Sequence, residues 1–170
     1  MHTQLRYKES TAQGVVYETR NAQKVLVITS YVVAQKVKML RKSYDAIFFE
    51  PDSTITQTQI RTIIEKNWCD SILHIDAIYS KDSLKQYDSL ASSVVVKLCA
   101  KKNISIVVSV RSLQNIPFSS YINRVLQTKR LCEKYSCKHK VIAVIAQNEL
   151  WYEDKDILAL ENVLLTHLVS

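Results

Sequence analysis

The fold of this chain is decided by the stretch VVVKLCAKKNISIVVSVRSL, residues 94–113. Its first half carries apolar residues at helical spacing, and Lys101-Lys102-Asn103 is polar enough to form a turn. The run at residues 104–110 is rich in β-branched side chains and lacks the polar alternation of a half-exposed strand. The stretch therefore predicts a helix, a turn and a strand that is covered on both faces.

The same alternation of apolar strand and amphipathic helix continues in both directions along the chain. Strands are predicted at residues 15–18, 24–29, 45–50, 70–75, 104–110 and 140–146. Helices are predicted at residues 31–42, 54–67, 121–135 and 155–168. The central helix, before residue 101, is predicted to bury one stripe: Leu90, Ala91, Val94, Val95 and Leu98. Alternation of this kind is typical of right-handed βαβ units and a parallel sheet.

Chain length limits which parallel fold is possible. A complete eight-unit TIM barrel usually needs about 250 residues, whereas this chain has 170. We predict a single α/β domain over residues 1–170 with a mostly parallel sheet, built as a shortened or incomplete TIM-like βα barrel. An open doubly wound sheet is the alternative, since periodicity does not separate the two. The polar residues 1–13 are predicted to be a loose N-terminal segment.

Composition argues against several function classes. Gly14 is the single glycine, so neither a Walker loop nor a G-x-G-x-x-G fingerprint can be formed. No apolar run approaches the roughly 18 residues of a membrane span, and the N-terminus has no secretory signal pattern. The four cysteines are sparse, which favours reduced, buried thiols over a disulfide framework. We expect a cytoplasmic protein without a membrane partner.

Positive charge is concentrated in one segment. Residues 101–140 hold nine Lys and Arg and one acidic residue, an excess of eight, against 23 basic and 16 acidic residues in the whole chain. A second basic set closes the predicted helix 31–42: Lys36, Lys38, Arg41 and Lys42. Clustered positive charge suggests a polyanionic partner. Solvated helix faces would produce the same pattern, and charge alone does not decide between them.

Two patterns carry metal-ligand chemistry, and neither is complete. His74-x-Asp76 at a strand end lacks further ligands, and Cys132-x4-Cys137-x-His139 lacks a second tight pair. We therefore predict that the chain binds no metal and no cofactor. Three carboxylates near predicted strand ends are candidate acid–base groups, although ion pairs with lysines explain them equally: Glu50, Asp76 and Glu149.

An ordered set of motifs resembles protein component 3 of archaeal ribonuclease P. The motifs are K-L-x-x-K-K-N at residues 97–103, S-x-R at 109–111, E-K-Y at 133–135 and an Ala-Gln pair at 146–147 ahead of Trp151. The similarity covers roughly residues 24–160. The chain departs from the family in its abbreviated N-terminal region and in the acidic Glu153 and Asp154, where basic residues are usual.

The resemblance implies a TIM-barrel-like fold and a subunit of the ribonucleoprotein endonuclease that removes the 5′ leader of precursor tRNA. In that family the RNA carries the chemistry with Mg²⁺, so the isolated chain is predicted to be non-catalytic. The implied partners are ribonuclease P RNA, protein component 2 and other protein subunits, with precursor tRNA contacted indirectly. A stand-alone phosphoesterase on a degenerate barrel is the alternative. The predicted RNA-binding residues are Arg61, Lys97, Lys101, Lys102, Arg111, Arg124, Arg130 and Lys134.

Overall fold

The computed structural model describes residues 4–75, 90–109 and 118–145 and the single positions 155 and 159. The strands are β1 (Gln4–Ser10), β2 (Val15–Glu18), β3 (Lys24–Ile28), β4 (Ala46–Phe49), β5 (Ser71–Leu73), β6 (Ser105–Ser109) and β7 (His139–Ile145). The helices are α1 (Tyr31–Ala34), α2 (Val37–Leu40), α3 (Gln57–Glu65), α4 (Ser93–Lys102) and α5 (Phe118–Lys134).

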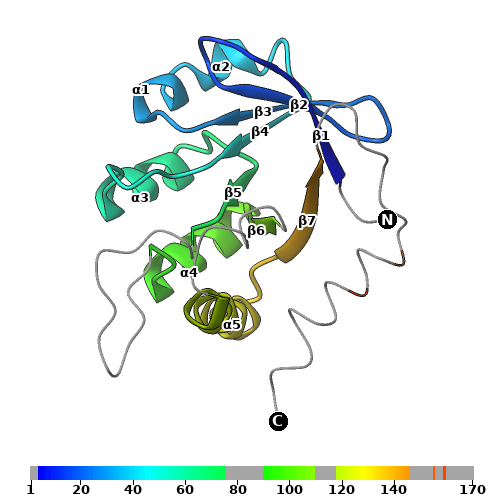
Figure 1. The fold of residues 1–170 in the computed structure, drawn as a ribbon. Helices are drawn as coiled ribbons and strands as arrows, with labels where there is room; N and C mark the ends of the chain where they lie inside the picture. The colour runs from blue at the N-terminus through cyan, green and yellow to red at the C-terminus, as the bar shows by residue number, and fades with distance from the viewer. Residues whose placement is uncertain (1–3, 76–89, 110–117, 146–154, 156–158, 160–170) are drawn as a thin grey trace.

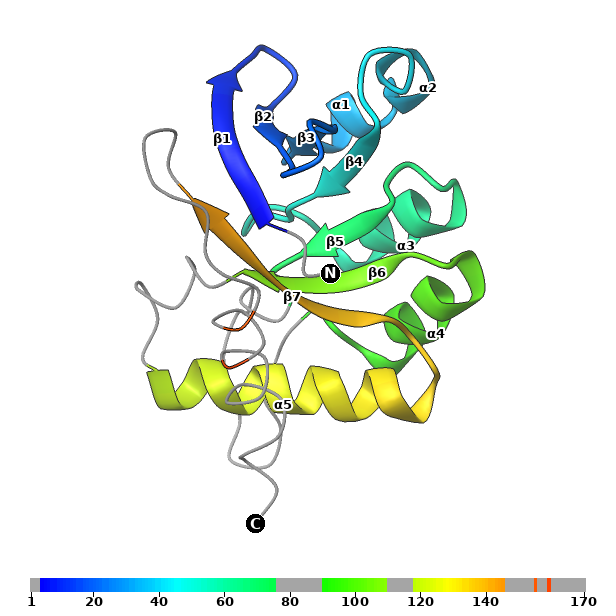
Figure 2. The ribbon, with the colours of Figure 1, turned by 90° about the vertical axis from the view of Figure 1, so that its right-hand side faces the viewer.

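The seven strands form a closed ring in chain order, with β1 hydrogen-bonded to both β2 and β7. Strands β1 and β3 to β7 all run in the same direction, while β2 is antiparallel to its neighbours β1 and β3. Figure 1 and Figure 2 show the curled sheet with the helices on its outer side. The mostly parallel α/β sheet is confirmed, and the sequential strand order differs from that of an open doubly wound sheet.

Apolar residues fill both sides of the strands. One buried cluster lies inside the ring, with Leu5, Phe48 and Ile142 among its members, and a larger one lies between the sheet and the helices. Strand β6 sits between β5 and β7, and it contributes Val107 to the inner cluster and Ile106 to the outer one. The prediction that this strand is covered on both faces is confirmed.

The N-terminal residues form a strand instead of the expected loose segment. Strand β1 buries Leu5 inside the ring, and Gln4 to Arg6 pair with Ala143 to Ile145 of β7. A turn between Thr11 and Gly14 then leads into β2. Gly14 has φ +155°, and a Cβ atom there would lie 2.1 Å from the carbonyl oxygen of Val27, so this position requires glycine.

Two predicted helices differ from the structure in detail. The expected helix over residues 31–42 is divided into α1 and α2, because Lys36 between them has φ −91° and ψ 8°. Helix α4 buries Val95, Val96 and Cys99, while Val94 is 44% exposed, so its inward stripe is rotated from the predicted one. Of the predicted helix 155–168 only the two single positions are described, and both are helical. No helix in the described part is long and apolar enough to span a membrane.

Candidate nucleic-acid interface

The basic ends of α4 and α5 lie at the same edge of the ring. Each helix leads into a strand, and β6 and β7 are parallel neighbours, so both helices end where these strands begin. We call this edge the amino-end rim. Lys101 and Lys102 occupy the last turn of α4, and Lys134 occupies the last turn of α5. Cations at these positions also interact favourably with the helix dipole.

Local sequence explains why α4 presents its lysines there. The helix begins at Ser92, whose side chain accepts a hydrogen bond from the backbone N–H of Val95 at 3.4 Å. It ends at Asn103, which adopts the left-handed conformation with φ 56°, a conformation that asparagine tolerates well. The chain then turns sharply into β6, which leaves Lys101 exposed and Lys102 half-buried at the rim.

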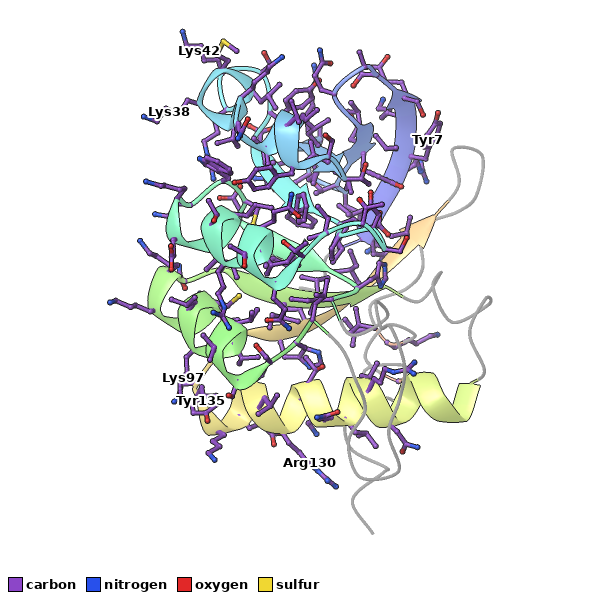
Figure 3. All side chains as sticks on the ribbon, turned by 90° about the vertical axis from the view of Figure 1, so that its left-hand side faces the viewer. Tyr7, Lys38, Lys42, Lys97, Arg130 and Tyr135 are labelled. Atoms are coloured by element: carbon purple, nitrogen blue, oxygen red, sulfur yellow. The ribbon has the colours of Figure 1, made fainter. Side chains whose placement is uncertain are left out.

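Lys97 of α4 and Lys134 of α5 converge on one aromatic ring. The Lys97 ammonium nitrogen lies 4.8 Å from the centroid of the Tyr135 ring, and that of Lys134 lies 5.6 Å from it. Figure 3 shows Lys97 beside Tyr135 at the end of α5. Both lysines are exposed and Tyr135 is half-buried against the core. Cation–π contacts of this kind fix the position of a charge while leaving it accessible.

We call Lys97, Lys101, Lys102, Lys134 and Tyr135 the α4–α5 surface. Within the described residues none of its four lysines forms an ion pair. The nearby Glu133 is paired with Lys129 at 3.6 Å. The surface therefore presents positive charge that no carboxylate of the described chain neutralises.

Two other predicted RNA-binding residues are exposed on the helices. Arg61 is exposed on α3. Arg130 lies on α5 and points away from the sheet in Figure 3. Arg111 lies outside the described residues.

Arg124, which is among the predicted RNA-binding residues and was therefore expected to be exposed, is buried. Arg124 is 1% exposed, and Thr128 and Cys132 on the same face of α5 are equally buried. These residues are spaced four apart, which places them on one stripe of the helix. The long apolar stem of arginine allows it to be buried on this stripe, although its head group is polar. We therefore leave Arg124 out of the candidate interface.

A second group of polar residues lies at the opposite edge, where β4 and β5 end. His74 is 6% exposed and has φ 51°, and its Nε2 lies 3.9 Å from Oε1 of Glu50. Burial lowers the pKa of His74 to about 4 and raises the pKa of Glu50. The sequence pattern His74-x-Asp76 indicated this strand end, although Asp76 lies outside the described residues.

The buried thiols gather near the start of β7. Cys99, Cys132 and Cys137 are free and buried, and a hollow of about 360 Å³ lies beside Cys132, Cys137 and His139. Hydrogen bonding to Cys132 and Cys99 lowers the pKa of Cys137, whereas hydrogen bonding and burial raise that of Cys99. No three His, Cys, Asp or Glu side chains in the described part of the chain are arranged to hold a metal ion.

Comparison with known proteins gives a similarity of shape. No family model and no curated protein matches the chain. Among solved structures, the chain is similar to a chain of the "cryo-EM structure of archaeal Ribonuclease P with mature tRNA". The identity is 17%, the TM-score is 0.45, and the match covers 82% of this chain and 72% of that one. A likeness at this level does not assign the chain to a family or a role.

Proposed function

We propose that the chain is a non-catalytic, RNA-binding protein subunit of ribonuclease P, built on a shortened TIM-like barrel. The observation that carries this proposal is the convergence of Lys97 and Lys134 on Tyr135. These residues come from two separate motifs that resemble component 3, K-L-x-x-K-K-N and E-K-Y. The motifs therefore supply one continuous surface instead of two unrelated helix ends.

The chemistry of this surface suits a phosphate backbone. Its lysines are point charges on flexible stems, which bind phosphates and position an RNA without reading its sequence. Neutralising each phosphate releases counterions, so the affinity should fall with rising salt concentration. The edge of Tyr135 offers a place against which a nucleotide can pack. Arg61 and Arg130 extend the proposed contact along α3 and α5.

In this proposal the RNA subunit performs the cleavage with Mg²⁺, and the chain holds the RNA. Protein component 2 and other subunits are the proposed protein partners, precursor tRNA is contacted indirectly, and the proposed location is the cytoplasm. The chain itself is proposed to need no cofactor or metal.

The proposal is tested by reconstituting precursor-tRNA cleavage from the RNA and protein subunits, with and without this chain. Addition of the chain should increase cleavage, and the chain alone should cleave nothing. Replacing Lys97, Lys101 and Lys134 by Ala should weaken binding to ribonuclease P RNA and lower the salt slope by somewhat under one unit for each lost contact.

Lys8→Ala is the matched control, because it removes one positive charge from β1, where Lys8 is paired with Glu18 at 3.0 Å. It should leave RNA binding nearly unchanged. The proposal is wrong if the alanine variants of Lys97, Lys101 and Lys134 bind the RNA as Lys8→Ala does and the chain has no effect on cleavage. Metal-dependent cleavage of a phosphodiester by the purified chain would support the phosphoesterase alternative instead.

A further inference from the structure

Helix α2 and the residues next to it carry a second group of exposed lysines that the proposed function does not use. Lys36, Lys38 and Lys42 are exposed within seven positions of the sequence, around Met39, which is itself 64% exposed. Figure 3 shows Lys38 and Lys42 pointing outward from this part of the molecule. We call the three lysines the α2 surface.

The α2 surface belongs to the amino-end rim. Helix α2 leads into β4 as α4 leads into β6 and α5 into β7, and these strands run in the same direction around the ring. The labelled side chains in Figure 3 agree, because Lys38, Lys42 and Lys97 all lie toward one side of the molecule. The two basic surfaces therefore face the same side, with the end of α3 between them.

The carboxylates near α2 are already engaged. Asp45 accepts a hydrogen bond from the backbone N–H of Lys24 at 2.7 Å. Asp70 accepts one from the backbone N–H of Ile47 at 2.8 Å and is bound by two nitrogens of Arg41 at 2.9 and 3.1 Å. In the described part of the chain, the lysines of the α2 surface form no ion pair.

A helix dipole does not account for these charges. Helix α2 has four residues, and a macrodipole needs a longer stack of aligned peptide groups. Three like charges so close together also repel one another in the absence of an anion. This cost is relieved when phosphates bind, which favours a polyanion over a partner protein at this position.

We propose that the α2 surface and the α4–α5 surface contact the backbone of one RNA helix, which lies along the amino-end rim. This inference rests on the proposed function. Three helix-to-helix steps, from α2 past α3 and α4 to α5, correspond to about 25–30 Å at the usual 8–10 Å spacing. Such a distance equals about eight phosphates along one strand at roughly 3.4 Å each. An RNA duplex must therefore exceed this length to extend from the α2 surface to the far side of the α4–α5 surface, on α5.

The experiment measures the binding of the purified chain to two RNA duplexes over a range of salt concentrations. One has about 6 base pairs and is too short to extend from α2 to α5, and the other has about 20 base pairs and covers the whole distance. The test variant is the triple replacement Lys36→Ala, Lys38→Ala, Lys42→Ala. The matched control replaces the same lysines with arginine, which keeps the charge.

The alanine triple variant should bind the long duplex about 10- to 100-fold more weakly than the wild type, with a salt slope lower by about 2–3 units. Its binding to the short duplex should change little, because the α4–α5 surface still holds it. The arginine variant should bind the long duplex within about threefold of the wild type, because the phosphates respond to charge. Thermal unfolding should be the same for all three proteins, since the lysines are exposed.

Failure of this inference differs from failure of the proposed function. If the α2 alanine variant binds the long duplex as the wild type does, while alanine at Lys97, Lys101 and Lys134 weakens binding, the α2 surface is not an RNA contact. If it loses only its binding to a protein subunit, the surface is a protein contact and the inference is again wrong. If the wild type binds neither duplex nor ribonuclease P RNA, the proposed function itself fails.

Discussion

His74 should make the protein sensitive to mild acid. Burial lowers its pKa in the folded chain from 6.5 to about 4, because the interior disfavours the imidazolium ion. The unfolded chain therefore takes up this proton first as the pH falls. Stability from the neutral side chain is complete above pH 6.5 and is lost progressively between pH 6.5 and about pH 4.

The size of the effect follows from the shift. At about 1.4 kcal/mol per pKa unit, the whole shift corresponds to roughly 3 kcal/mol, of which about 2 kcal/mol is lost between pH 7 and pH 5. Glu50 lies 3.9 Å from the imidazole, and its raised pKa has the opposite sign, since the folded state then binds the extra proton. This offset grows toward the lower end of the range, so the comparison is made above about pH 5.

Urea unfolding of the wild type and of His74→Asn at pH 7, 6 and 5 is the assay. Asparagine is the matched replacement because it does not titrate and tolerates the positive φ of this position. The wild type should lose about 2 kcal/mol more than the variant between pH 7 and pH 5. His139, whose pKa is also lowered to about 4, titrates in both proteins and cancels. Parallel losses of stability in the two proteins would refute the reasoning.

Three further predictions concern packing and hydrogen bonds. Gly14→Ala should lower the free energy of unfolding by about 2–4 kcal/mol, because the new Cβ meets a carbonyl oxygen of β3; unchanged urea unfolding would contradict this. Thr56→Ala should cost about 1 kcal/mol in thermal unfolding, since its side chain caps α3; a larger effect from Thr58→Ala would argue against the cap. Asp70→Ala should destabilise by about 1–3 kcal/mol because it leaves the N–H of Ile47 unpaired. Arg41→Ala should cost at most about 1 kcal/mol, because that ion pair is more than a third exposed, and equal costs for the two would be inconsistent with this account.

The interior strands could be predicted from the sequence because a strand that is buried on both faces has a continuous run of apolar residues. The continuous apolar runs that became β3, β4 and β6 stand out without any knowledge of their partners. Strand β1 has no such run, since Leu5 alternates with polar neighbours and its partner β7 lies more than 130 residues away in the sequence. Closure of the ring depends on pairing between residues far apart in the sequence, so no short segment of the sequence predicts it.

Part of the candidate interface could likewise be predicted from the sequence, and part could not. The positions of Lys101 and Lys102 at a helix end follow from local sequence, and the structure agrees. The meeting of Lys97 with Tyr135 depends on how α4 packs beside α5, which periodicity does not report. The burial of Arg124 could be predicted only in part. The sequence shows that Arg124 shares a helical stripe with Thr128 and Cys132, but packing decides whether that stripe is buried or exposed.

The pairing of β1 with β7 has a consequence for synthesis of the protein. Residues 4–6 are synthesised long before residues 143–145, and they cannot pair with them until nearly all of the described chain has left the ribosome. During that interval the outer edges of β1 and β6 carry unpaired backbone groups, which can join strands of other molecules. The finished ring has no such edge. We therefore expect a short-lived risk of aggregation in the nascent chain, and chains shortened before His139 should accumulate as insoluble protein.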